Sequence, residues 1–100
     1  MKENYRARNC EEFVMPVLMS LGFYDKKSKK AKEIENEVCE ILEITDEERL
    51  AYFDATPEIR ILRSKLDWTL YKMWKNGLIE RKSIGVYCIM NQGEKMLLNY

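Results

Sequence analysis

Residues 56–89 constrain the fold most, because they combine an unbroken helical pattern with a glycine break and a short extended segment. The apolar side chains of the first part repeat at three- and four-residue spacing, which gathers them on one buried face of a helix. These side chains are Leu62, Leu66, Thr69 and Met73, flanked by Ile59 and Leu70. The stretch therefore predicts a long amphipathic helix at the centre of the domain.

Both ends of this helix carry local signals. Thr56 can cap it and Pro57 suits its first position, whereas Asn76-Gly77 should end it. Residues 86–89 then alternate between two faces, as a strand does, and Gly85 can adopt the positive φ of a tight turn. This order of helix, break and hairpin predicts the recognition helix and wing of a winged-helix domain.

Several motifs extend this interpretation to most of the chain. They are Leu66-Asp67-Trp68-Thr69, Gly77-Leu78-Ile79-Glu80-Arg81, Gly85-Val86-Tyr87-Cys88-Ile89, Gly93-Glu94-Lys95-Met96-Leu97-Leu98 and, upstream, Phe13-Val14-Met15-Pro16-Val17-Leu18. Together they resemble the N-terminal domain of Mrr-type restriction proteins, from about Phe13 onward. Two positions depart from that family's pattern, with Tyr87 where a Trp is usual and Met90 where a Thr is usual.

We therefore expect an α+β fold, a winged helix-turn-helix with three core helices, a β-wing and a C-terminal helix. An additional turn or short helix is expected between the second and third core helices. Residues 1–9 are predicted to form an N-terminal arm, and residues 10–100 a single winged-helix domain.

The first core helix is expected to start after Asn9, a capping residue, and to end at Gly22. Pro16 leaves two alternatives, because it either kinks this helix or marks its true start near Met15. The basic run 25–30 is expected to be a loop.

The second core helix is predicted from about Lys29, with Ile34, Val38, Ile41 and Leu42 inward and Glu33, Glu35, Glu37 and Glu40 outward. Thr45 begins a capping box, which predicts a short helix that reaches about Phe53. A last helix should follow Gly93.

The residue inventory excludes several kinds of chemistry. The chain has no histidine, so it lacks Ser-His and Cys-His nucleophile pairs. Its three cysteines, Cys10, Cys39 and Cys88, are far apart and lie in apolar patterns, so we expect reduced thiols and neither a metal site nor a cofactor. Without a membrane-length apolar run or a signal segment, the predicted location is cytoplasmic.

Positive and negative charges are segregated along a chain whose formal net charge is zero. The formal net charge is +3 for residues 1–30, −8 for residues 31–58 and +5 for residues 59–100. We interpret the acidic middle as a solvated helix face, because its carboxylates follow helical spacing and helix N-termini. The basic third segment is the predicted recognition segment.

One face of the central helix is mixed basic and aromatic, opposite the apolar stripe. If this face enters the major groove of DNA, its cations meet phosphates and base edges, and the wing touches the DNA backbone or the minor groove. The predicted DNA-contact residues are Arg60, Arg63, Ser64, Lys65, Lys72, Arg81 and Lys82.

Three large apolar side chains on this face, Ile61, Trp68 and Tyr71, need a separate explanation. Trp68 could pack against the arm or the second helix as part of a wide buried surface. The three residues could instead form a protein interface. Stacking on an unpaired base is a third alternative.

We therefore expect a non-catalytic DNA-binding domain. The resemblance implies that it targets a restriction or defence system to double-stranded DNA, with cleavage performed by a separate nuclease domain. The alternative is a protein-interaction or dimerisation module, with a second copy or a nuclease domain as partner. The overall pI of about 6.3 favours this alternative, because many DNA-binding domains are basic.

Overall fold

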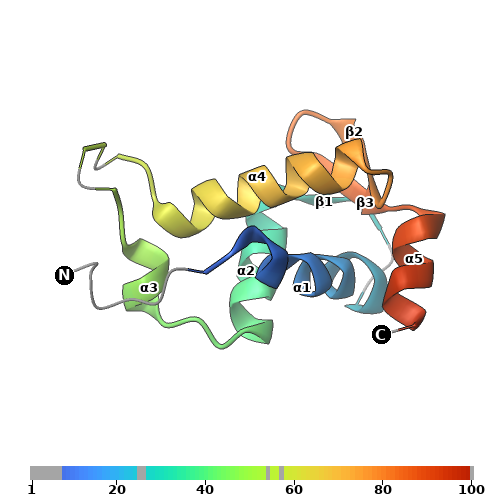
Figure 1. Ribbon diagram of the computed structural model, residues 1–100, viewed down its shortest axis with the longest axis horizontal. Helices are drawn as coiled ribbons and strands as arrows, with labels where there is room; N and C mark the ends of the chain where they lie inside the picture. The colour runs from blue at the N-terminus through green and yellow to red at the C-terminus, as the bar shows by residue number, and fades with distance from the viewer. Residues whose placement is uncertain (1–7, 25–26, 54, 57, 100) are drawn as a thin grey trace.

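The computed structural model describes residues 8–24, 27–53, 55–56 and 58–99 (Figure 1). Its α-helices are α1 (Val14–Met19), α2 (Ala31–Ile41), α3 (Asp46–Leu50), α4 (Ile61–Lys75) and α5 (Asn91–Leu98). Its strands are β1 (Lys29–Lys30), β2 (Ile79–Ser83) and β3 (Val86–Ile89). A 3₁₀ turn, η2 (Cys10–Phe13), precedes α1, and a π-helical turn, η3 (Ser20–Tyr24), follows it. The predicted α+β class is confirmed, and this order of elements is compatible with a winged helix.

The three strands form one antiparallel sheet in the order β1-β3-β2. β2 and β3 make a tight hairpin, in which Gly85 has the expected positive φ of 75°. A bulge between Arg81 and Ser83 shifts the register within the hairpin. Lys29 of β1 pairs with Tyr87 of β3, so β1 closes the far side of the hairpin.

The expectation of a loop throughout residues 25–30 is wrong at Lys29 and Lys30; residues 25–26 lie outside the described part. The side chain of Lys29 is only 2% exposed. Its Nζ donates to the carbonyl oxygen of Ser20 at 2.6 Å and to Oε1 of Glu37 at 2.7 Å. These contacts compensate for burying the ammonium group and hold the strand against η3 and α2. Helix α2 therefore starts at Ala31 rather than Lys29.

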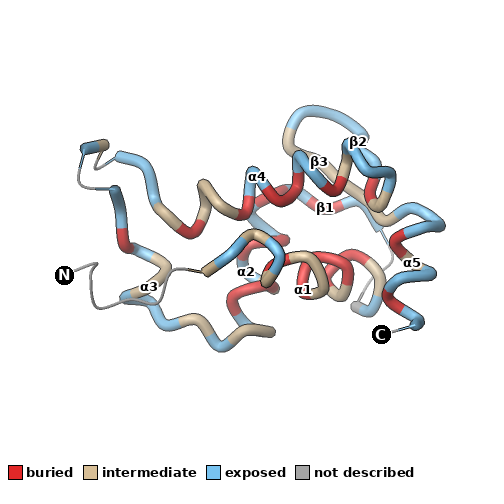
Figure 2. Tube along the Cα trace, in the orientation of Figure 1, coloured by how far each residue is buried: buried red, intermediate tan, exposed pale blue. Residues whose placement is uncertain are grey.

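The core lies between α1, α2 and α4, and residues from the hairpin and α5 complete it (Figure 2). The predicted apolar face of α4 is confirmed, with Leu62, Leu66, Thr69, Leu70 and Met73 buried. From the other elements, Phe13, Val17, Leu18, Leu21, Ile34, Val38, Ile79 and Leu97 pack with them. Burying each large side chain stabilises the fold by roughly 1.5–3 kcal/mol.

The predicted start of the central helix is wrong, because α4 begins at Ile61 and not near Thr56. Other backbone hydrogen bonds hold the segment before it: the N–H of Phe53 donates to Ile59 O at 3.3 Å, and the N–H of Ile61, the first residue of α4, donates to Ala51 O at 3.0 Å. Pro57 lies outside the described residues. The predicted end at Asn76-Gly77 is confirmed, and Gly77 has a φ of 81°.

The start of the first helix resolves the question about Pro16. Asn9 is an N-cap, as predicted, but it caps η2, and its N–H donates to Glu12 Oε2 at 3.3 Å. Helix α1 starts at Val14, so Pro16 lies in the first turn, where a missing N–H costs little. The predicted end at Gly22 is wrong, because helical conformation continues to Tyr24. A Cβ on Gly22 would lie 2.8 Å from Leu97 Cδ2, so this glycine allows α5 to approach.

The short third helix is present, with Thr45 Oγ1 accepting from the Glu48 N–H at 3.1 Å. It ends at Leu50 rather than Phe53. On α2, Glu33 and Glu40 are exposed as predicted, whereas Glu35 is buried, which contradicts the prediction. Glu35 Oε2 accepts from Arg49 Nε at 3.0 Å and Oε1 accepts from Arg63 at 3.2 Å. This carboxylate therefore joins α2 to both α3 and α4.

Candidate nucleic-acid interface

Three aromatic rings follow one another along α4, of which Trp68 and Tyr71 are exposed and Trp74 is half-buried. The rings of Trp68 and Tyr71 are stacked, with centroids 5.4 Å apart and planes 11° apart. Tyr71 meets Trp74 edge to face at 6.1 Å. Their spacing of three residues places successive rings on neighbouring turns of the helix. Trp68 is 54% exposed and Tyr71 43% exposed, so the expectation that Trp68 belongs to a wide buried surface is wrong.

Three cations lie over these rings. Lys72 Nζ lies 5.7 Å from the centroid of Trp68, and Lys75 Nζ lies 4.7 Å from that of Trp74. The guanidinium carbon of Arg81, on β2, lies 5.0 Å from the centroid of Trp74. These distances are in the range of cation–π attraction. The six residues Trp68, Tyr71, Lys72, Trp74, Lys75 and Arg81 form a continuous surface, which we call the cation–aromatic strip.

The strip carries a charge of three without carboxylate partners. Within the described part of the chain, Lys72, Lys75 and Arg81 take part in no ion pair. A cation held by a ring rather than by a carboxylate keeps its positive potential for an external anion. The strip also joins the end of α4 to the hairpin, because Arg81 comes from β2.

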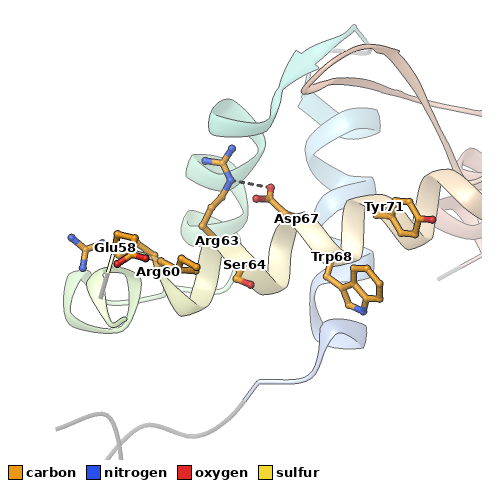
Figure 3. A pocket seen from close by; sticks show the side chains of 8 residues that line it. Glu58, Arg60, Arg63, Ser64, Asp67, Trp68 and Tyr71 are labelled. Atoms are coloured by element: carbon orange, nitrogen blue, oxygen red, sulfur yellow. Dashed lines mark hydrogen bonds and ion pairs between the residues drawn. The ribbon is translucent and has the colours of Figure 1, made fainter. Parts of the chain in front are cut away.

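A shallow groove lies over the first half of the same helix. Figure 3 shows Arg63 and Asp67 along one edge and Ser64 and Trp68 along the other. Its lining consists of Glu58, Ile59, Arg60, Arg63, Ser64, Asp67, Trp68 and Tyr71. Two arginines are balanced there by two carboxylates, so this half of the helix is far less positive than the strip.

Arg63, one of the predicted DNA contacts, is engaged within the protein. Its Nε donates to Asp67 Oδ1 at 3.0 Å, and its Nη1 donates to Glu35 at 3.2 Å. Burial lowers the pKa of Arg63, but the hydrogen bond and charge of Asp67, together with Glu35, outweigh it and leave the pKa raised. This guanidinium stays charged and is held by two carboxylates, which indicates a structural role.

Three other predicted contacts also have internal partners. Lys65 Nζ donates to Arg8 O at 2.5 Å, which ties α4 to the segment before η2. Arg60 Nη1 donates to Leu50 O at 2.6 Å. Lys82 lies 3.6 Å from the carboxylate of Glu80, and both side chains are about half exposed.

Two further predicted residues are only partly exposed. Ser64 lines the groove, and Ile61, a predicted interface residue, begins α4 in a half-buried position. Of the seven predicted DNA contacts, Lys72 and Arg81 are therefore the two that the structure brings into the strip.

Two strip residues were missing from the predicted sites. Lys75 lies on the exposed helical face that the sequence indicated, three residues after Lys72, so its spacing could have included it. Trp74 carries no such signal, because its position beside Arg81 depends on how β2 packs on α4.

Several carboxylates in the acidic middle of the chain, residues 31–58, are engaged in ion pairs. Glu48 accepts from Arg8 Nε at 2.5 Å, Glu37 pairs with Lys29, and Glu35 pairs with two arginines. Among the residues that the structure describes, no group of three His, Cys, Asp or Glu side chains is arranged to hold a metal ion. In the same part of the chain, no helix is both long and apolar enough to cross a membrane.

Comparison with known proteins gives one family. The sequence profile of the Mrr N-terminal domain matches residues 11–99, which is nearly the whole chain. No curated protein and no solved structure matches the chain.

Proposed function

The chain belongs to the Mrr N-terminal domain family, and we propose that it is a non-catalytic winged-helix domain that binds double-stranded DNA for a restriction or defence system. Membership of this restriction-system family supports a defence-related role. The matched domain is the N-terminal one and not the catalytic nuclease domain, so cleavage would be the task of a nuclease domain acting with it.

The observation that carries the DNA assignment is the position of the three unpaired cations in the strip. Lys72 and Lys75 lie one turn apart on α4, and Arg81 extends the same surface onto β2. Lysine and arginine side chains arranged in this way can follow a phosphate backbone and displace its counterions. Because the charges in the neighbouring groove are balanced, the C-terminal half of α4 would be the main phosphate contact.

In this proposal α4 acts as the recognition helix and the β2–β3 hairpin acts as the wing. Phosphate contacts would come first from Lys72, Lys75 and Arg81, with Lys82 beside them on the hairpin. Arg60 and Ser64 would reach DNA only at the edge of the contact. Arg63 and Lys65, held by internal partners, would position α4 instead.

A titration of a short fluorescent duplex, followed by anisotropy, tests this proposal. Wild-type protein should bind, and the double variant Lys72→Glu/Lys75→Glu should lose at least tenfold in affinity because two attractive charges become repulsive. Lys32→Glu is the matched control, since Lys32 is an exposed lysine on α2, outside the strip. Equal weakening by both variants would reject the strip as the contact surface.

A second candidate function, protein interaction, is favoured by the segment between α3 and α4. Tyr52, Phe53 and Ile59 are exposed there, as is Leu50 at the end of α3, and Figure 1 shows the described part of this segment projecting from the body of the molecule. Exposed apolar side chains of this size are typical of interfaces. A second copy or a nuclease domain would be the partner. Light scattering of wild type and Phe53→Ala tests self-association: a mass that rises with concentration only in wild type would support it, and a constant monomer mass would exclude it.

A further inference from the structure

The rings of the strip exceed what contact with a fully paired duplex requires. Lysine and arginine alone suffice for phosphate contacts, and the faces of duplex bases are already stacked on each other. Trp68 and Tyr71 nevertheless expose about half of their surface beside those cations. An aromatic face next to a row of cations is the combination that proteins use to bind unpaired nucleotides.

The ring pair is held in place before any ligand arrives. Trp68 stacks on Tyr71, and the ammonium groups of Lys72 and Lys75 lie 5.7 Å and 5.6 Å from the centroids of the Trp68 and Tyr71 rings. The helix under it is tied to η2 by Thr69, whose hydroxyl lies 3.3 Å from Cys10 O. Little side-chain entropy would therefore be lost when a flat ligand stacks on the pair.

The groove beside Trp68 contains polar side chains that can hydrogen-bond to a base. The Ser64 hydroxyl and the Asp67 carboxylate line this groove together with the indole ring, as Figure 3 shows. A base that stacks on the exposed ring surface would have hydrogen-bonding groups at its edge and strip cations near its phosphate.

We propose that Trp68 and Tyr71 form a stacking platform for an unpaired nucleotide in DNA, next to phosphates that Lys72 and Lys75 hold. This inference rests on the proposed DNA-binding function and specifies the form of DNA that the site prefers. The favoured ligand is a duplex that contains a short unpaired segment.

The test compares two fluorescent DNAs of one sequence, a fully paired duplex and the same duplex with a three-nucleotide bulge. Wild-type protein should bind the bulged DNA about five- to 100-fold more tightly, the range expected for stacking of one base. Trp68→Ala should abolish this preference, so that the bulged and the paired DNA bind this variant with equal affinity. Trp68→Phe, which keeps a ring, should retain part of the preference.

Phe23→Ala is the matched control, because Phe23 is an exposed aromatic residue outside the strip. It should leave both affinities unchanged, and circular dichroism should confirm that each variant is folded. Equal wild-type affinity for the two DNAs would overturn the platform while the proposed function stands. Absence of binding to either DNA would overturn both. A wild-type dimer that Trp68→Ala dissociates would also overturn the platform, because the rings would then be a protein interface.

Discussion

The indole of Trp68 stacks on the phenol ring of Tyr71, with ring centroids 5.4 Å apart, on the solvent side of α4. This pair divides the exposed face of the helix into two halves of different character. On its C-terminal side lie the unpaired cations of the strip, and on its N-terminal side lies a groove with balanced charges. The division predicts that phosphate affinity and helix anchoring depend on different basic residues.

Arg63 and Lys72 should therefore behave as opposites. Arg63→Met should lower the free energy of unfolding by about 1 kcal/mol, because Glu35 and Asp67 lose a partner, and should leave DNA affinity within twofold. Lys72→Met should lower DNA affinity and leave stability unchanged within about 0.5 kcal/mol. Urea unfolding and duplex titration of both variants measure this contrast. Loss of affinity in Arg63→Met at full stability would place Arg63 among the DNA contacts.

Among the carboxylates of α2, replacement of Glu35 should lower the stability of the protein most. Glu35→Gln removes the charge that joins Arg49 and Arg63 in a buried position, and it should destabilise the protein by about 1–3 kcal/mol. Glu40→Gln, an exposed change on the same helix, serves as the control and should cost less than about 0.5 kcal/mol. Urea unfolding of both variants is the measurement. Equal stabilities would show that the ion pairs of Glu35 with Arg49 and Arg63 contribute nothing to the free energy of unfolding.

Two glycines should respond to alanine for different reasons. A Cβ on Gly93 would lie 2.3 Å from Leu78 O, so Gly93→Ala must push α5 away and should cost about 1–3 kcal/mol. Gly77 has open space around it but a φ of 81°, so Gly77→Ala should cost only about 1 kcal/mol of backbone strain. Thermal unfolding of both variants compares the two costs. A Gly93→Ala protein as stable as wild type would contradict the close approach of α5 to Leu78.

Cys39 should be the slowest thiol to react. Burial raises its pKa, outweighing the opposing charge of Arg49, so little of the reactive thiolate is present at pH 8. Cys10 and Cys88 are only half-buried. Mass spectrometry after timed alkylation should show Cys39 modified last in folded protein, and the three rates should converge in denaturant. Modification of Cys39 as fast as Cys88 in the folded state would contradict the packing of α2.

The parts of the fold that sequence could predict are those determined by local chemistry. The apolar stripe of α4 follows from residue spacing, and the turns at Gly77 and Gly85 follow from the freedom of glycine at positive φ. The start of α4 could not be predicted, because the backbone N–H groups of Phe53 and Ile61 bond to the carbonyl oxygens of Ile59 and Ala51, which are six and ten residues away.

The candidate site divides in the same way. Lys72 and the exposed face that carries it were visible in the helical pattern. The burial of Glu35 was not, because its partners lie 14 and 28 residues away in the sequence. The same reason holds for Arg63 and Glu35, which are 28 residues apart, whereas Asp67, the second carboxylate that holds Arg63, is only four residues away on the same helix. Hydrogen bonds and ion pairs between distant elements thus decide which of the basic residues have an internal partner.

The most direct test of DNA binding by the strip is the salt dependence of duplex affinity, measured for wild type and for Lys72→Ala/Lys75→Ala/Arg81→Ala between about 50 and about 200 mM salt. If the three cations contact phosphates, the plot of log affinity against log salt should be less steep in the variant by about 3, roughly one for each lost contact. An identical slope in the two proteins would contradict the account, because DNA would then be bound elsewhere on the domain.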